Sequence, residues 1–108
     1  MKNIFERGPE QIPTKEAVLD IIKGFEENTA IIREESDEQG LYLLEANVNG
    51  ENPGEYTQYQ YMRAGNFKEG QSLETVIHVV YYQDDIPCGG HDVATFRSQT
   101  GIWEVEKK

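Results

Sequence analysis

Near the start of the chain, apolar residues recur at three- and four-residue spacing, which is typical of one face of an amphipathic α-helix. The apolar positions are Ala17, Val18, Ile21, Ile22 and Phe25. Thr14 follows Pro13 and is a suitable N-cap, while Glu16 and Asp20 lie toward the positive end of the helix dipole. The pattern predicts a helix from Thr14 to Glu27, preceded by an arm over residues 1–13.

After Asn28 the pattern changes to short runs rich in Tyr, Val, Ile and Thr, separated by clusters of turn-forming residues. The turn clusters read SDEQG, NGENPGE, GNFKEGQS and QTG. The predicted strands are Thr29 to Glu35, Leu41 to Val48, Tyr56 to Ala64, Leu73 to Gln83, Asp92 to Ser98 and Ile102 to Glu106. Such short connections favour an antiparallel meander, and 108 residues suit one domain over residues 1–108.

The run from Leu73 to Tyr82 is apolar at both of its alternating sets of positions. Ile77 and Val79 belong to one set, whereas Val76 and Val80 belong to the other. A strand that is apolar on both faces is expected near the centre of a sheet. A single helix can cover only one sheet face, so the other face must be solvated, closed by curling of the sheet, or covered by a partner.

These elements predict an α+β fold, with one N-terminal amphipathic helix packed on a curved antiparallel sheet of five or six strands in meander order. This layout resembles the cystatin-like class, in which a sheet wraps around one helix. The Gln-x-Val-x-Gly hairpin with which cystatins block cysteine proteases has no match in the corresponding stretch, QYQYMRAG. The resemblance is therefore one of layout, and protease inhibition is not expected from it.

Aromatic residues are concentrated in the predicted strands, and large exposed apolar patches often mark interaction sites. The residues expected to form a ligand or partner face are Tyr59, Tyr61, Arg63, His78, Tyr82 and Trp103. The leading hypothesis is a non-catalytic interaction protein that uses this face or an edge strand to bind a protein partner. Self-association as a homodimer is the other form of this hypothesis, because a lone helix leaves sheet surface and an edge uncovered.

A second hypothesis is a small ligand-binding protein or enzyme whose pocket lies between helix and sheet, around His78. Tyr59, Tyr61 and Arg63 share one set of alternate positions, whereas His78 and Tyr82 share another on the next strand. Whether these two sets face each other depends on strand register, which the sequence does not reveal.

The stretch IPCGGH holds the only cysteine, Cys88, and one of two histidines, His91. Both are competent zinc ligands, but a structural zinc site needs four ligands and a catalytic one three. The nearby Asp84, Asp85 and Asp92 disfavour a nucleophilic thiolate. The preferred interpretation is a connection between two strands, in which Gly89 and Gly90 permit the turn. No metal, cofactor or catalytic residue is therefore assigned.

A net charge of −10 opposes contact with nucleic acid or an anionic membrane surface. It also motivates a third hypothesis, an acidic mimic that occupies a nucleic-acid-binding protein. One cysteine allows no internal disulfide, and the sequence contains no signal-peptide run or membrane-spanning run. We therefore expect a cytoplasmic protein without a membrane or direct nucleic-acid partner.

Overall fold

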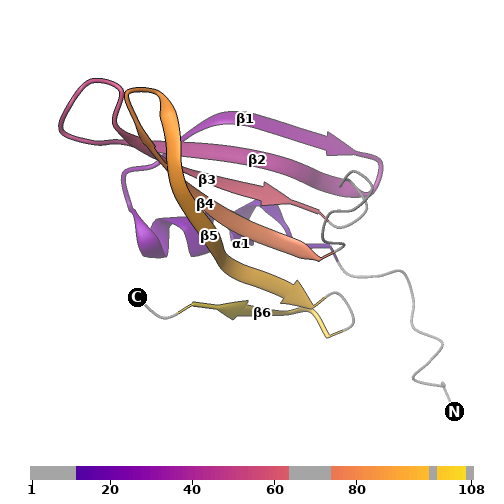
Figure 1. Ribbon diagram of the computed structural model, residues 1–108. Coiled ribbons are helices and arrows are strands. Elements are labelled where there is room, and N and C mark those ends of the chain that lie inside the picture. Colours follow the sequence, from indigo (N-terminus) through magenta and orange to yellow (C-terminus); the bar gives the residue numbers. More distant parts are fainter. Residues whose placement is uncertain (1–11, 64–73, 98–99, 107–108) are drawn as a thin grey trace, which may run out of the picture.

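A computed structural model describes residues 12–63, 74–97 and 100–106 of the chain. It contains one helix, α1 (Lys15–Phe25), followed by six strands. The strands are β1 (Ala30–Asp37), β2 (Gly40–Asn49), β3 (Tyr56–Met62), β4 (Thr75–Gln83), β5 (Ile86–Arg97) and β6 (Ile102–Val105). All strand pairs are antiparallel, and their order in the sheet is the chain order, β1 to β6. Figure 1 shows this open meander with α1 against one face. The predicted α+β fold is confirmed.

Helix α1 begins as the sequence predicted, because the Thr14 side chain accepts a hydrogen bond from the Ala17 N–H at 3.1 Å. It ends at Phe25, two residues before the predicted end at Glu27. Val18 and Ile22 are fully buried against the sheet, and Phe25 packs at the edge of this core. The apolar face of the helix therefore forms one half of the core, as its spacing predicted. Within the described residues, no helix has the length and apolar character needed to cross a membrane.

The sheet residues that meet the helix come from alternate positions of neighbouring strands. The core on the sheet side is formed by Leu41, Leu44, Ala46, Tyr59, Tyr61, Ile77, Val79, Val93 and Ala94. β4 lies between β3 and β5, so the strand with two apolar sets is interior, as expected. The predicted strand ends Ala64, Leu73 and Ser98 lie outside the described residues, as do residues 1–11 of the predicted arm over residues 1–13.

The prediction that Cys-Gly-Gly forms a strand connection is wrong. β5 begins at Ile86, six residues before the predicted start at Asp92, so the whole IPCGGH stretch lies within a strand. The turn is formed instead by Asp84 and Asp85, whose φ angles are 52° and 64°. Positive φ at both central residues is what a two-residue type I′ hairpin turn requires, and aspartate tolerates it better than most residues.

The two glycines of this stretch serve the strand differently. A Cβ atom on Gly90 would clash with the Val79 carbonyl oxygen, whereas one on Gly89 would have nothing within 4 Å. The β4–β5 register also shifts twice, which leaves Cys88 and Val93 as extra residues on β5. Such bulges bend a strand and increase its twist. Gly90 therefore permits a close approach of two strands rather than a turn.

Candidate functional site

Two of the predicted site residues, Tyr59 and Tyr61, lie on the side of the sheet that faces the helix. Tyr59 and Tyr61 point toward α1 and are almost completely buried. Phe25 stacks on the Tyr59 ring, with 6.2 Å between ring centroids. Burial raises the pKa of both tyrosine hydroxyls to about 12, because the phenolate would lose its hydration. These two tyrosines are core residues, and they do not line an accessible face.

Trp103 lies on the same side of the sheet as Tyr61, where the two rings are 6.4 Å apart. It also packs against Phe96 at 5.1 Å. His78 and Tyr82 lie on the opposite side, because Ile77 and Val79, the two neighbours of His78 along β4, form part of the core. The structure thus does not bring the six predicted residues to one place. His78 does not lie between helix and sheet.

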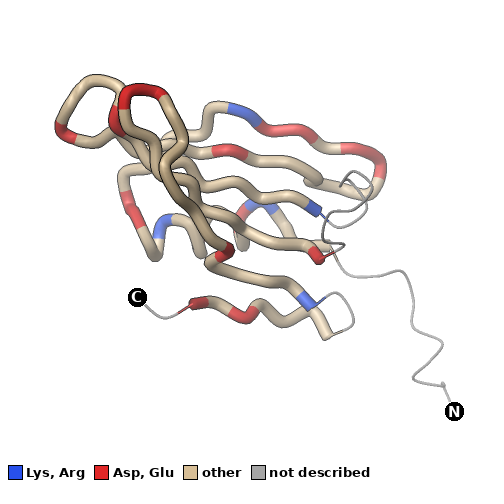
Figure 2. Tube along the Cα trace, viewed as in Figure 1, with Lys and Arg blue, Asp and Glu red and all other residues tan. Residues whose placement is uncertain are grey.

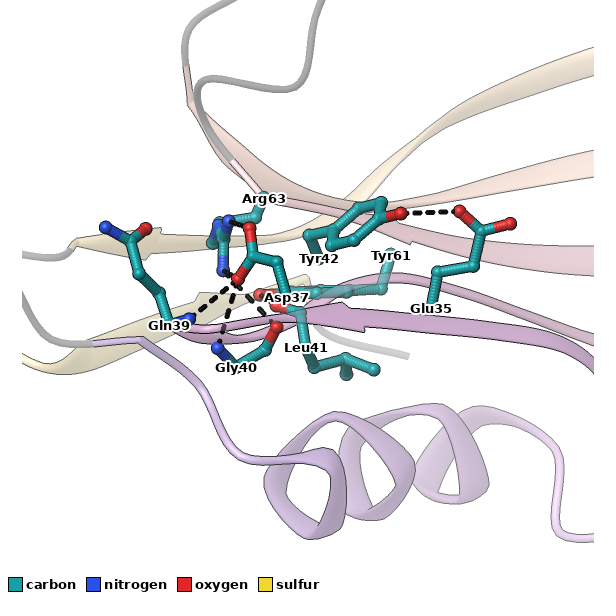
Figure 3. Close-up of polar contacts among 8 residues, drawn as sticks. All are labelled: Glu35, Asp37, Gln39, Gly40, Leu41, Tyr42, Tyr61 and Arg63. Carbon is teal, nitrogen blue, oxygen red and sulfur yellow. Dashed lines mark hydrogen bonds and ion pairs between the residues drawn. The ribbon is translucent and has the colours of Figure 1, made fainter.

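Arg63 follows the end of β3 and joins it to the β1–β2 hairpin (Figure 3). Its guanidinium donates to both carboxylate oxygens of Asp37 and, at 3.4 Å, to the carbonyl oxygen of Gly40. Only 8% of Arg63 is exposed. The Asp37 carboxylate in turn accepts the backbone N–H groups of Gln39 and Gly40, at 2.8 and 3.2 Å. Arg63 is therefore an anchor for the hairpin.

The charge state of this anchor is fixed by its own hydrogen bonds. The bonds from Arg63 lower the pKa of Asp37, and the same bonds raise the pKa of Arg63. The guanidinium also lies 5.8 Å from the centroid of the Tyr42 ring, within the range of a cation–π contact. Both partners thus remain charged at neutral pH. The pair has little capacity left for an external ligand.

The sheet face opposite α1, here called the open face, carries a row of polar side chains that crosses five strands. The row consists of Arg33, Glu45, Gln60, His78 and Asp92, each paired with the next in the strand register. We call these five residues the central row. Its position follows from alternation, because the neighbours of each interior member belong to the buried core.

His78 and Asp92 form the firmest contact in the central row. The Nδ1 atom of His78 lies 2.7 Å from the Oδ1 atom of Asp92. The His78 side chain is 34% exposed and the Asp92 side chain is 53% exposed. The carboxylate holds the imidazole ring in one orientation through its Nδ1 atom.

Next to the central row, amide side chains extend the polar surface along β3 and onto β2. The Nε2 group of Gln60 donates to Oε1 of Gln58 at 2.6 Å, and Gln58 donates to Oδ1 of Asn47 at 2.9 Å. Gln58 is buried among its neighbours despite its position on the open face. Because each amide is held by the next, these groups present a defined pattern of donors and acceptors rather than freely rotating chains.

At the β1 end of the central row, Arg33 pairs with Glu35, with 2.8 Å between the closest atoms. Hydrogen bonds from Tyr42 and Arg33 lower the pKa of Glu35. The hydrogen bond to Glu35 raises the pKa of Arg33, and the charge of Glu45 adds to the same shift. This end of the row therefore carries a fixed positive charge between two carboxylates.

Cys88 and His91, the alternative metal ligands, have separate partners. The Cys88 thiol donates to the carbonyl oxygen of Tyr81 at 3.3 Å, while Nε2 of His91 lies 3.3 Å from Glu106. Among the described residues, no group of three or more His, Cys, Asp or Glu side chains is placed to hold a metal ion.

A shallow cleft of about 360 Å³ lies beside Cys88, at the end of the sheet formed by the β2–β3 loop and the β4–β5 turn. Its wall includes Tyr56 and Tyr82, whose rings stack at 4.4 Å with only 12° between their planes. Because the two rings cover each other, the cleft offers their edges and outer faces rather than a slot between them. Of the six residues predicted to form the ligand or partner face, Tyr82 alone lines it.

Sequence reasoning did not single out Arg33, Glu45, Gln60 and Asp92 as members of one surface. A signal was present in the alternation of β2 and β3, where polar Glu45 and Gln60 each stand between apolar or aromatic neighbours. Aligning the two strands required a register that only the structure supplies. Comparison with protein families, with curated proteins and with solved structures found no match to this chain.

Proposed function

We propose that this protein is a non-catalytic interaction protein that binds a protein partner or a second copy of itself through the open face. The observation that carries the proposal is the central row, an ordered and partly exposed series of hydrogen-bonding groups on the sheet face away from α1. Interfaces need polar groups whose positions are fixed before binding, because less conformational entropy is then lost on association.

The basic side chains of the described residues are already paired within the protein, and this supports a protein partner rather than a nucleic acid. Every Lys and Arg side chain in the described part of the chain already contacts an acceptor of the protein itself. The contacts are Lys15 with Glu34, Lys23 with backbone carbonyls, Arg33 with Glu35, Arg63 with Asp37 and Arg97 with Glu104. A phosphate backbone would therefore meet basic groups that, apart from Lys23, carboxylates of the protein already neutralise.

The two other hypotheses receive less support. A pocket around His78 between helix and sheet would need His78 on the face where Tyr59 and Tyr61 lie, and it is on the other. An acidic mimic would gather its carboxylates on one surface, whereas Figure 2 shows them on β1, on the hairpin ends and near β6. We place the protein in the cytoplasm, in keeping with its single cysteine.

Site-specific photo-crosslinking in cells tests the proposal for a partner of any identity. A benzophenone amino acid replaces Gln60 in the centre of the open face or, as a control, Asp20 on the exposed side of α1. We expect a protein adduct from position 60 and none of that mass from position 20. If the folded protein gives no adduct at position 60, the open face is not an interaction surface.

A further inference from the structure

The central row is self-complementary in charge. Arg33 stands at one end and Asp92 at the other, with Glu45 and His78 at the two intermediate positions and Gln60 in the middle. A second copy of the row, laid over the first in reversed strand order, places Arg33 over Asp92 and Glu45 over His78. Gln60 then lies over its own counterpart, and the contact between Arg33 and Asp92 occurs twice, as does the contact between Glu45 and His78.

This reversal is what a twofold axis parallel to β3 produces when two open faces meet. Such an axis reverses the order of strands but keeps each residue at its own height along the strand. An axis perpendicular to the strands would instead place Arg33 on Arg33 and Asp92 on Asp92. The charge pattern therefore selects the first arrangement.

A neighbouring row gives independent support to the same axis. Leu43 and Met62 are partly exposed register partners on the side of the sheet away from α1, in the next row toward the Arg63 end of the sheet, and Val76, the third member of this row, is already buried within the chain. The axis parallel to β3 places Met62 over Met62, so that two partly exposed apolar side chains meet. The perpendicular axis would set this apolar row against Asn47, Gln58 and Val80.

We propose that the open face binds a second copy of this chain, through a twofold axis parallel to β3. The inference rests on the proposed function and names its partner. Facing sheets pack about 10 Å apart, a gap that arginine and glutamate side chains bridge from opposite sides. Arg33 and Asp92 are both about half exposed, and each can contact the other copy while keeping its internal partner.

The strength of this dimer is limited by size and by charge. Five strands at about 4.8 Å spacing give a contact only roughly 24 Å wide, which is at the small end for a specific interface. The net charge of −10 on each copy also opposes association. We expect dissociation in the micromolar range.

A charge-swap experiment tests the contact between Arg33 and Asp92, with sedimentation velocity of the full chain over about 1 to 300 µM as the measurement. R33E sets a glutamate against Asp92, and D92R sets an arginine against Arg33. We expect each to weaken dimerisation at least tenfold and the double variant to restore it to within about threefold. K15E makes the same charge change beside α1 and should leave the dimer unaffected.

Variants at the axis give a second test that does not depend on the folding of D92R. Q60E and Q60K each place like charges opposite each other across the axis, so each alone should favour the monomer. An equimolar mixture should form a heterodimer, which native mass spectrometry separates from both homodimers. A homodimer of undiminished strength in either variant would overturn the proposed axis.

The outcomes separate this inference from the proposed function. A wild-type monomer at every concentration, with a crosslink from position 60 to a different protein, overturns the second-copy inference and leaves the proposed function standing. A dimer that is indifferent to R33E, D92R and Q60E lies on another surface and also overturns the inference. A monomer without any crosslink at position 60 overturns both.

Discussion

Gln60 and Tyr61 are neighbours on β3 and have opposite environments. Tyr61 is fully buried beneath α1, and its hydroxyl reaches the carbonyl oxygen of Leu41 at 3.4 Å. Gln60 points the other way, into a row of polar groups that remain partly exposed. One strand therefore supplies the core with one set of side chains and a candidate interface with the other. Stability should depend on the first set and association on the second.

The largest expected effect comes from truncating the core side of β3. Tyr61→Ala removes a large buried ring between α1 and Trp103, and we expect it to lower the free energy of unfolding by about 3–5 kcal/mol. Gln60→Ala, one residue away, should lower it by less than about 1 kcal/mol. Urea denaturation followed by circular dichroism gives both values. Equal losses would contradict the division of β3 into two faces.

The second-largest loss of stability should come from breaking the ion pair between Arg63 and Asp37. Asp37→Asn preserves an oxygen for the N–H groups of Gln39 and Gly40 but leaves the buried guanidinium without a countercharge. We expect a clear fall in the urea midpoint, since hydrogen bonds to charged groups are stronger than those between neutral groups. Lys15→Ala breaks an exposed pair with Glu34 and should cost less than about 1 kcal/mol. Denaturation midpoints that match for the two variants would show that Arg63 is not an anchor.

The two glycines of β5 offer a matched pair on the strand that carries Asp92. Gly90→Ala forces a methyl group against the Val79 carbonyl oxygen, and we expect a loss of about 1–3 kcal/mol. Gly89→Ala meets open space and should change stability by less than about 0.5 kcal/mol. Thermal unfolding of the two variants checks this. A reversed order would mean that β5 does not approach β4 as described.

Alkaline pH should destabilise the folded protein through its two core tyrosines. Tyr59 and Tyr61 have pKa values of about 12 in the folded protein, against about 10 when unfolded. As the pH rises, the unfolded chain loses the two phenolic protons before the folded protein does. The free energy of unfolding is therefore at its full value below about pH 10 and falls between about pH 10 and 12. Each tyrosine contributes a slope of about 1.4 kcal/mol per pH unit. Tyr61→Phe should remove its share of this slope, and denaturation at several pH values measures the change.

The smallest expected effect is on the open face itself. His78→Gln removes the contact with Asp92, a pair that water already reaches, and should change the free energy of unfolding by less than about 1 kcal/mol. The same urea titrations provide the comparison with Tyr61→Ala. A loss above about 2 kcal/mol would mean that His78 serves the fold, and the open face would then lose its main claim to a binding role.

The sequence predicted the helix, its N-cap and the antiparallel meander, because these follow from local spacing and turn composition. It did not predict where β5 begins, because Gly-Gly is a common turn former whereas Asp84–Asp85 adopts positive φ under the constraint of two paired strands. Pairing between strands decided that boundary.

The sequence predicted only in part where the residues of the expected partner face would lie. Alternation correctly grouped Tyr59 with Tyr61 and His78 with Tyr82, but it could not tell which group faces the helix. The large apolar area of the tyrosine rings, which suggested an interaction surface, instead contributes to the core. The central row depends on side chains from five strands, and only the full register brings them into line.

The Ile86–Asp92 segment also forms part of the edge of the sheet. Within the described residues, β6 pairs only with Ala94 to Arg97, so the outer side of this first half of β5 is a sheet edge. Pro87 lacks a backbone N–H, and the bulge at Cys88 interrupts the regular spacing of hydrogen-bonding groups. Such an edge is a poor template for an incoming strand. We therefore expect the stretch that first suggested reactive chemistry to disfavour pairing with an edge strand of another molecule.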